Sequence, residues 1–186
     1  MKKTLLTILC TVLVCSCVMG VTLAFLVDKT DSITNTFTIG NIEIVLDESE
    51  DLDLKMIPGK TIEKDPTVTV KAGSEACWLF IKIDEVNITN YITYTVDESW
   101  EELDGVAGVY YIEIANATAE DTPYTVLTDN EVTVKTSVTQ AQLEEATGDN
   151  APKLIFTAYA VQKDNVVATA ADAWVVATTG DLPTGN

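Results

Sequence analysis

The sequence contains no histidine and no arginine. Without an imidazole, the chain cannot build a Ser-His-Asp or Cys-His catalytic site or an H-E-x-x-H zinc site, because each needs a base that titrates near neutral pH or a neutral nitrogen ligand. Carboxylate, lysine and tyrosine chemistry remain, but no spacing of these residues indicates a catalytic or metal-binding site. We therefore predict a protein that is not an enzyme and that carries no cofactor.

Positive charge is scarce as well. The 11 lysines stand against 29 aspartates and glutamates, which gives a net charge of −18, and removal of Lys2 and Lys3 with the N-terminal segment described below makes it −20. Binding to nucleic acid requires a basic patch that releases counterions from the phosphate backbone. A chain with this charge repels phosphate backbones and anionic lipid headgroups, so nucleic acid is excluded as a partner.

Cysteine is rare, and three of the four cysteines lie within the first 24 residues. Cys77 stands alone in the rest of the chain, which therefore forms no internal disulfide and must hold its core by packing. A domain of about 150 residues buries roughly 70% of its unfolded surface, which is enough for such a core. We interpret Cys77 as a small buried apolar residue; a bridge between subunits or a reactive thiol is the alternative.

The N-terminus has the pattern of an export signal. Two lysines precede the uncharged apolar segment Leu5–Val18, and the small residues that follow suit cleavage between Ala24 and Phe25. We therefore predict a signal peptide over residues 1–24 and a secreted mature protein. The alternative is a retained membrane anchor, because the uncharged stretch Thr4–Val27 is long enough to cross a bilayer.

After residue 35 the dominant pattern is an alternation of apolar and polar residues, which is typical of β-strands. In the segment Cys77–Asp84 every odd position is apolar, while the even positions change from Trp78 and Phe80 to Lys82 and Asp84. This predicts a strand that is central at one end and half-exposed at the other. The strands predicted in this way are Thr67–Lys71, Cys77–Asp84, Tyr91–Val96, Val109–Ile114, Tyr124–Leu127, Glu131–Lys135 and Lys153–Gln162.

Turn-rich and acidic stretches separate these strands, and few segments favour helices. Thr139 with Gln142 has the form of a capping box and predicts one short helix, and Thr169 with Asp172 predicts another. Near the first strand the apolar positions change from odd to even at Gly40, which predicts a β-bulge or a change of sheet there. The pattern as a whole favours an all-β antiparallel sandwich.

Two further motifs each allow two interpretations. The acidic segment Asp47–Asp53 could hold Ca²⁺ through its oxygens, but it lacks the spacing of a calcium loop, and we favour a solvated acidic loop. Tyr91, Tyr94, Tyr110 and Tyr111 could form a sugar-binding platform, but tyrosines on alternating strands more often fill the rim of a sandwich core. We favour the core interpretation for these four residues.

Several segments together resemble the TasA/camelysin family of exported Gram-positive proteins, which leave the cell through a SipW-type signal peptidase. The resemblance covers the end of the signal, the first third of the mature chain and a part near the C-terminus, whereas residues 85–149 match only loosely. The matching segments are Thr22–Asp28, Ser32–Ile44, Pro58–Gly59, Lys64–Trp78, Ala158–Gln162 and Ala173–Trp174.

The resemblance implies a jelly-roll β-sandwich and, for the best-known members, assembly into extracellular biofilm matrix fibres. In that assembly the mature N-terminal segment adds as a strand to the next subunit, so that main-chain bonds give affinity and alternate side chains fill pockets. Carried onto this sequence, the candidate donor strand is residues 25–35. Phe25 and Val27 would lie on one of its faces and Leu26 on the other.

The expected fold is therefore a jelly-roll-like antiparallel β-sandwich over residues 36–180, with one or two short helices, followed by a tail over residues 181–186. We expect a secreted structural protein of the extracellular matrix or cell surface that associates with its own copies or with related matrix subunits. A SipW-type signal peptidase is the partner expected during export, and membrane contact is expected only through the uncleaved signal.

Two other functions stay open at this point. One is a monomeric surface module that binds carbohydrate or protein. The other is a peptidase, because camelysin itself is classified as a metallopeptidase. A chain without histidine cannot form a conventional zinc site, so we do not extend peptidase activity to it.

Overall fold

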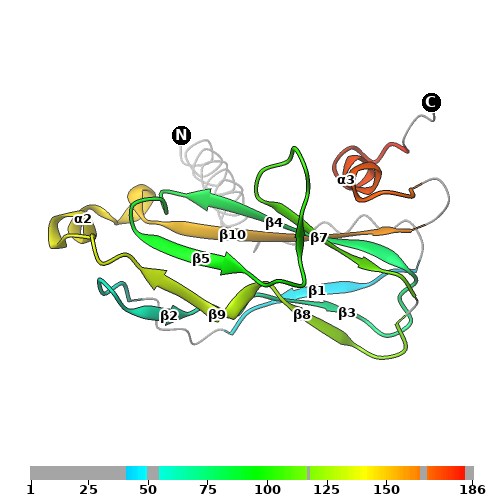
Figure 1. Cartoon of the computed structure of the whole chain (residues 1–186), viewed down its shortest axis with the longest axis horizontal. Helices are drawn as coiled ribbons and strands as arrows, with labels where there is room; N and C mark the ends of the chain where they lie inside the picture. The colour runs from blue at the N-terminus through cyan, green and yellow to red at the C-terminus, as the bar shows by residue number, and fades with distance from the viewer. Residues whose placement is uncertain (1–40, 50–54, 117, 164–166, 183–186) are drawn as a thin grey trace, which may run out of the picture. The chain divides into compact units, whose positions relative to one another are not determined.

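The computed structural model describes residues 41–49, 55–116, 118–163 and 167–182 (Figure 1). The chain divides into two units, residues 1–33 and 34–186, and every described residue belongs to the second. The predicted signal peptide and donor segment, and the irregularity predicted at Gly40, lie outside the described residues.

The described residues form ten strands and two short α-helices, and every strand pairing among them is antiparallel. This confirms the all-β fold class. The strands are β1 (Ile44–Asp47), β2 (Thr61–Glu63), β3 (Thr67–Val70), β4 (Cys77–Val86), β5 (Ile92–Val96), β6 (Glu101–Glu102), β7 (Val109–Ile114), β8 (Thr122–Thr125), β9 (Leu127–Val134) and β10 (Lys153–Gln162). The helices are α2 (Gln140–Glu145) and α3 (Ala170–Thr179), and a single 3₁₀ turn, η1, covers Gly148–Asn150.

The strands form two layers (Figure 1). One layer has the order β10-β4-β7-β6. The other consists of β1-β3-β8 and β2-β9-β5, which continue one another because β2 is followed closely by β3 and β8 by β9. The pairings are nested, since β4 pairs with β7 while β2 and β3 pair with β9 and β8. Rolling up one long hairpin produces such nested pairs, and this is the arrangement of a jelly roll.

Both faces of β4 are buried over its first half, as the sequence pattern predicts. Cys77, Leu79 and Ile81 are fully buried in the core between the two layers. On the opposite face, Trp78 and Phe80 belong to a second apolar cluster beneath α3. The strand then becomes half-exposed, and the side chain of Lys82 forms an ion pair with Asp84 at 2.8 Å.

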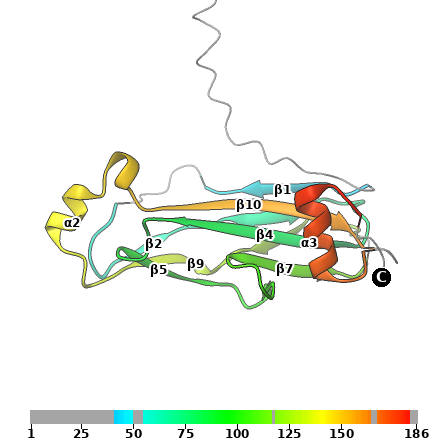
Figure 2. The same cartoon turned by 90° about the horizontal axis from the view of Figure 1, so that it is seen from above.

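The helix α3 covers the outer face of the β10-β4-β7 sheet at one end (Figure 2). Thr169 caps its N-terminus, because the Thr169 hydroxyl accepts a hydrogen bond from the backbone N–H of Asp172 at 3.1 Å. Ala173 and Val176 are buried against the sheet. The ring of Trp174 packs 5.4 Å from the Phe80 ring, which closes the second cluster. Both helices predicted from capping residues are therefore present.

A bulge that the sequence did not predict lies in β9. Tyr94 of β5 is opposite Val132, but Val96, two residues further, is opposite Leu127, so the register shifts between these pairs. Asp129 and Asn130 take up the extra length with φ angles of 57° and 56°. Aspartate and asparagine tolerate this left-handed region better than other residues with a side chain. The bulge bends β9 near the point where the β2-β9-β5 sheet continues into the β1-β3-β8 sheet of the same layer.

The thiol of Cys77 has the environment of a structural residue. It is fully buried, and burial raises its pKa from 9.0 to about 11. The interpretation of Cys77 as a buried core residue is confirmed. Since the unfolded thiol ionises at lower pH than the folded one, ionisation favours unfolding as the pH rises between these two values.

We expect Cys77 in the folded mature chain to react with a thiol reagent at neutral pH far more slowly than in the chain unfolded by denaturant. Both the shielding of the sulfur and the shortage of thiolate slow the native reaction. Stopped-flow labelling of the two samples measures the difference. Equal rates would mean that Cys77 is accessible and able to bridge subunits.

Gly108 allows the loop before β7 to approach β4 closely. Its carbonyl accepts a hydrogen bond from the backbone N–H of Ile83 at 2.8 Å, and its φ angle is +72°. A Cβ atom at this position would lie 2.7 Å from the Ile83 carbonyl oxygen, closer than real contacts allow. Gly105 in the same loop has a similar φ of +78°, but a Cβ there would meet nothing within 4 Å.

We therefore expect Gly108→Ala to lower the free energy of unfolding by about 3 kcal/mol, from the left-handed backbone and the backbone clash together. Gly105→Ala is the matched control. It should lower the free energy of unfolding by only about 1 kcal/mol, because it carries the cost of the left-handed backbone without the backbone clash. Urea unfolding of both variants measures the difference. Equal losses would show that the loop can move away from β4 at no cost.

Candidate functional site

The residues predicted to carry function lie outside the described part of the chain. These are the cleavage site at Ala24 and Phe25 and the assembly residues Phe25, Leu26 and Val27. The structure therefore shows where an added strand could be received, but not the strand itself. A sheet edge with unpaired backbone groups is a template for another strand.

The strand β10 provides a long edge. It pairs with β4 over ten residues, from Lys153 opposite Val86 to Gln162 opposite Cys77. On its other side β10 pairs with no strand among the described residues. A row of backbone N–H and C=O groups therefore runs along an edge longer than that of β1, β5 or β6.

The side chains of β10 alternate between the core and the outer face. Ala158 and Ala160 are buried between the layers, and Phe156 packs against the same core. On the outer face, the side chain of Ile155 is 45% exposed, whereas Tyr159 packs edge-on against Trp174 with ring centroids 5.2 Å apart. The end of β10 near Lys153 is thus uncovered, and the other end lies beside α3.

The strand β1 lies beside β10 at the edge of the opposite layer (Figure 2). Among the described residues it pairs with β3 alone. Ile42 and Ile44 point into the core, which agrees with the predicted even-numbered apolar face. The buried Ser74 fixes the start of this segment, because its hydroxyl accepts from the Glu43 N–H at 3.1 Å and donates to the Glu43 carbonyl at 3.2 Å. Two strand edges that have no further strand partner within the described ranges therefore lie side by side, and we call the line between them the seam.

An apolar groove opens near the first residues of β10. Its volume is about 380 Å³, and two lysines stand among its mostly apolar lining. Lys64 already forms an ion pair with Glu48, and its ammonium lies 5.4 Å from the centre of the Phe156 ring. The residues that line the groove are Met56, Ile62, Lys64, Ile92, Val132, Ala146, Ala151, Pro152, Lys153 and Leu154.

The described part of the acidic segment is engaged in local bonds. Glu48 pairs with Lys64, and the Ser49 hydroxyl donates to the Asp65 carboxylate at 2.5 Å. The hydrogen bonds from Ser49 lower the pKa of Asp65 below its usual value. Residues 50–54 lie outside the described part. Among the described residues, no three side chains of aspartate, glutamate, cysteine or histidine gather closely enough to hold a metal ion.

The four tyrosines lie at the rim of the two clusters, as the core interpretation predicts. Tyr91, Tyr94 and Tyr110 pack against the main core, and Tyr111 packs beneath α3. The hydroxyl of Tyr94 donates to Glu85 at 2.7 Å, and burial, followed by this bond, raises its pKa. This hydrogen bond links β5, which carries Tyr94, to β4, which carries Glu85.

No helix in the described part of the chain has both the length and the apolar composition needed to span a bilayer.

The comparisons with known proteins add one match. Searches of curated proteins and of solved structures gave no match. A family model described as camelysin metallo-endopeptidase matches residues 1–179. Because this match covers nearly the whole chain, the protein belongs to the camelysin family, the TasA/camelysin group that its sequence segments resemble.

Proposed function

We propose that this chain is a structural protein of the cell surface or biofilm matrix, and that it assembles by donating its mature N-terminal segment to the next copy. Membership of the camelysin family supports a secreted protein of structural or peptidase type. The observation that carries the structural proposal is the ten-residue edge of β10, which has no further strand partner among the described residues and lies beside the free edge of β1.

The candidate donor matches this edge in length. Residues 25–35 are about as long as β10 and contain neither glycine nor proline, so they can run as one strand. An added strand forms main-chain hydrogen bonds with the sheet edge, and these do not depend on which side chains it carries. Every second side chain of the added strand then faces the seam between β10 and β1. Cleavage after Ala24 by a SipW-type peptidase would free this strand, which couples export to assembly.

The apolar groove offers a place for the beginning of the donor. We assign the side chains of Phe25 and Val27 of a second copy, which share one face of the donor strand, to this groove, with Leu26 on the opposite face. The groove is mostly apolar, and Lys153 in its lining carries charge opposite to that of Asp28, the next residue of the donor, whereas Lys64 is already paired with Glu48. The groove is also continuous with the first residues of β10, so one bound segment could use both.

Charge opposes this assembly. Each mature chain carries about −20, and the mutual repulsion acts over roughly 8 Å at physiological salt. Protonation of carboxylates or binding of divalent cations reduces the repulsion without requiring a specific site. We therefore propose that acid pH or Ca²⁺ favours fibres.

The family description also suggests a peptidase activity. We propose that this chain lacks that activity. The sequence has no histidine to serve as a zinc ligand or a general base. Among the residues that the structure describes, no three side chains of aspartate, glutamate or cysteine gather into a set of metal ligands. A structural role requires none of this chemistry.

We expect the chain that begins at Phe25 to form fibres, and the chain that lacks Phe25–Asn35 to stay monomeric, because only the first carries the donor strand. Electron microscopy and size-exclusion chromatography of both chains, in neutral buffer, in acid and with Ca²⁺, check this. Monomers from both chains under all three conditions would exclude strand donation and favour a monomeric binding module.

We also expect Ile155→Lys to reduce fibre yield about tenfold at a fixed protein concentration, because a lysine on a strand edge opposes the addition of another strand. Val175→Lys on α3 is the matched control. Val175 is 46% exposed and Ile155 is 45% exposed, and both variants change the net charge equally. Sedimentation of polymer from soluble protein measures the yield, and equal yields would place the contact away from β10.

A further inference from the structure

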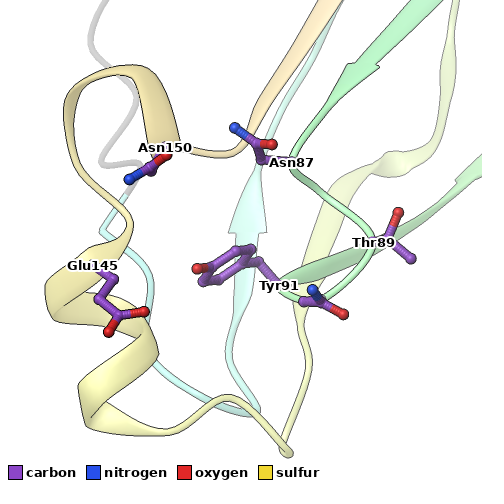
Figure 3. Close-up of a pocket in the computed structure, with 6 residues that line it drawn as sticks. Asn87, Thr89, Tyr91, Glu145 and Asn150 are labelled. Carbon is purple, nitrogen blue, oxygen red and sulfur yellow. The ribbon is translucent and has the colours of Figure 1, made fainter.

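A polar cleft lies at the end of the sandwich where β4 turns into β5 (Figure 3). The turn over residues 87–91 forms one wall, and the end of α2 with the turn η1 forms the other. Its volume is about 550 Å³, within the usual range for a small-molecule site. The residues that line it are Asn87, Thr89, Asn90, Tyr91, Glu145 and Asn150.

Direct hydrogen bonds hold the two walls together. The side-chain amide of Asn87 donates to the Asp149 carbonyl at 3.1 Å, and the Tyr91 hydroxyl donates to the Gln142 carbonyl at 3.3 Å. The turn is also anchored from below, because Ile88 is buried and the Lys135 ammonium donates to the Thr89 carbonyl. The cleft is therefore formed before any ligand binds, which reduces the entropy lost on binding.

The lining has the chemistry to bind hydroxyl groups. The amides of Asn90 and Asn150 make no side-chain hydrogen bond to another described residue, and each offers both donors and acceptors. Glu145 adds an acceptor, and the ring of Tyr91 adds an apolar face between the two walls (Figure 3). No lysine lines the cleft, so an anionic ligand would meet a carboxylate and no compensating charge.

We propose that this cleft binds a neutral saccharide. Sugar hydroxyls both donate and accept hydrogen bonds, which matches amide side chains, and a pyranose ring presents a C–H face that can lie on tyrosine. A peptide would instead need a free strand edge or apolar pockets for its side chains, and this lining supplies neither. The proposal does not depend on fibre assembly, because the cleft shares no lining residue with the groove assigned to the donor, although Glu145 and Asn150 are the chain neighbours of Ala146 and Ala151 in that groove.

The test uses the isotope-labelled protein in its exported form, kept at neutral pH and low salt without Ca²⁺ so that the charge of about −20 opposes assembly, and a panel of neutral oligosaccharides at millimolar concentration. The panel contains tetrasaccharides of β-1,4-glucose, α-1,4-glucose, β-1,3-glucose, mannose, galactose and N-acetylglucosamine, with oligogalacturonate as the anionic comparison. We expect at least one neutral sugar to shift the backbone amide signals of residues 87–91 and 145–150, and oligogalacturonate to shift none.

Variants then locate the contact. Asn90→Ala and Asn150→Ala should each weaken binding of that sugar by about tenfold, the effect of one lost hydrogen bond. Asn116→Ala, an exposed asparagine on the loop after β7, is the matched control and should bind normally. Absence of shifts with every neutral sugar, shifts confined to other residues, equal binding by all three variants, or preference for the anionic sugar would each overturn the proposal.

Discussion

The pairing of β4 with β10 on one side and with β7 on the other places one row of side chains between the two layers and another row beneath α3. Both rows are apolar where β4 begins, so the strand is stable only if both faces are covered. The main core buries one face, and α3 covers the other, where Trp174 packs against Phe80. Because Cys77 is buried and is the single cysteine after residue 17, this packing has to supply the stability of the fold without an internal disulfide.

Much of this arrangement could be predicted from local patterns. The alternation in Cys77–Asp84 gave the correct two faces of β4, and the capping residues Thr139 and Thr169 gave the starts of both helices. These features depend on residues close together in the chain. The strand β2 was missed because three residues carry too little periodicity, and β6 because Glu101–Glu102 has no apolar residue at all.

The bulge and the polar cleft show the limit of such reasoning. Asp129 and Asn130 fall between the predicted strands Tyr124–Leu127 and Glu131–Lys135, whereas in the structure they lie inside the single strand β9, where their turn-forming character marks a bulge and not a strand end. The cleft could not be predicted, because its two walls lie more than fifty residues apart and meet only through the fold. Tyr91 was expected to begin a strand; instead it ends the turn that lines the cleft. A site formed by loops that lie far apart in the chain produces no periodic pattern in the sequence.

The ten-residue pairing between β10 and β4 also has a mechanical consequence. When two paired strands are pulled along their own direction, the hydrogen bonds between them lie across the force and share the load. When strands are peeled apart from one end, the same bonds break one after another at low force. A strand added along β10 would transmit tension to β4 in the first of these geometries, so a fibre built in this way would resist stretching far better than bending or peeling.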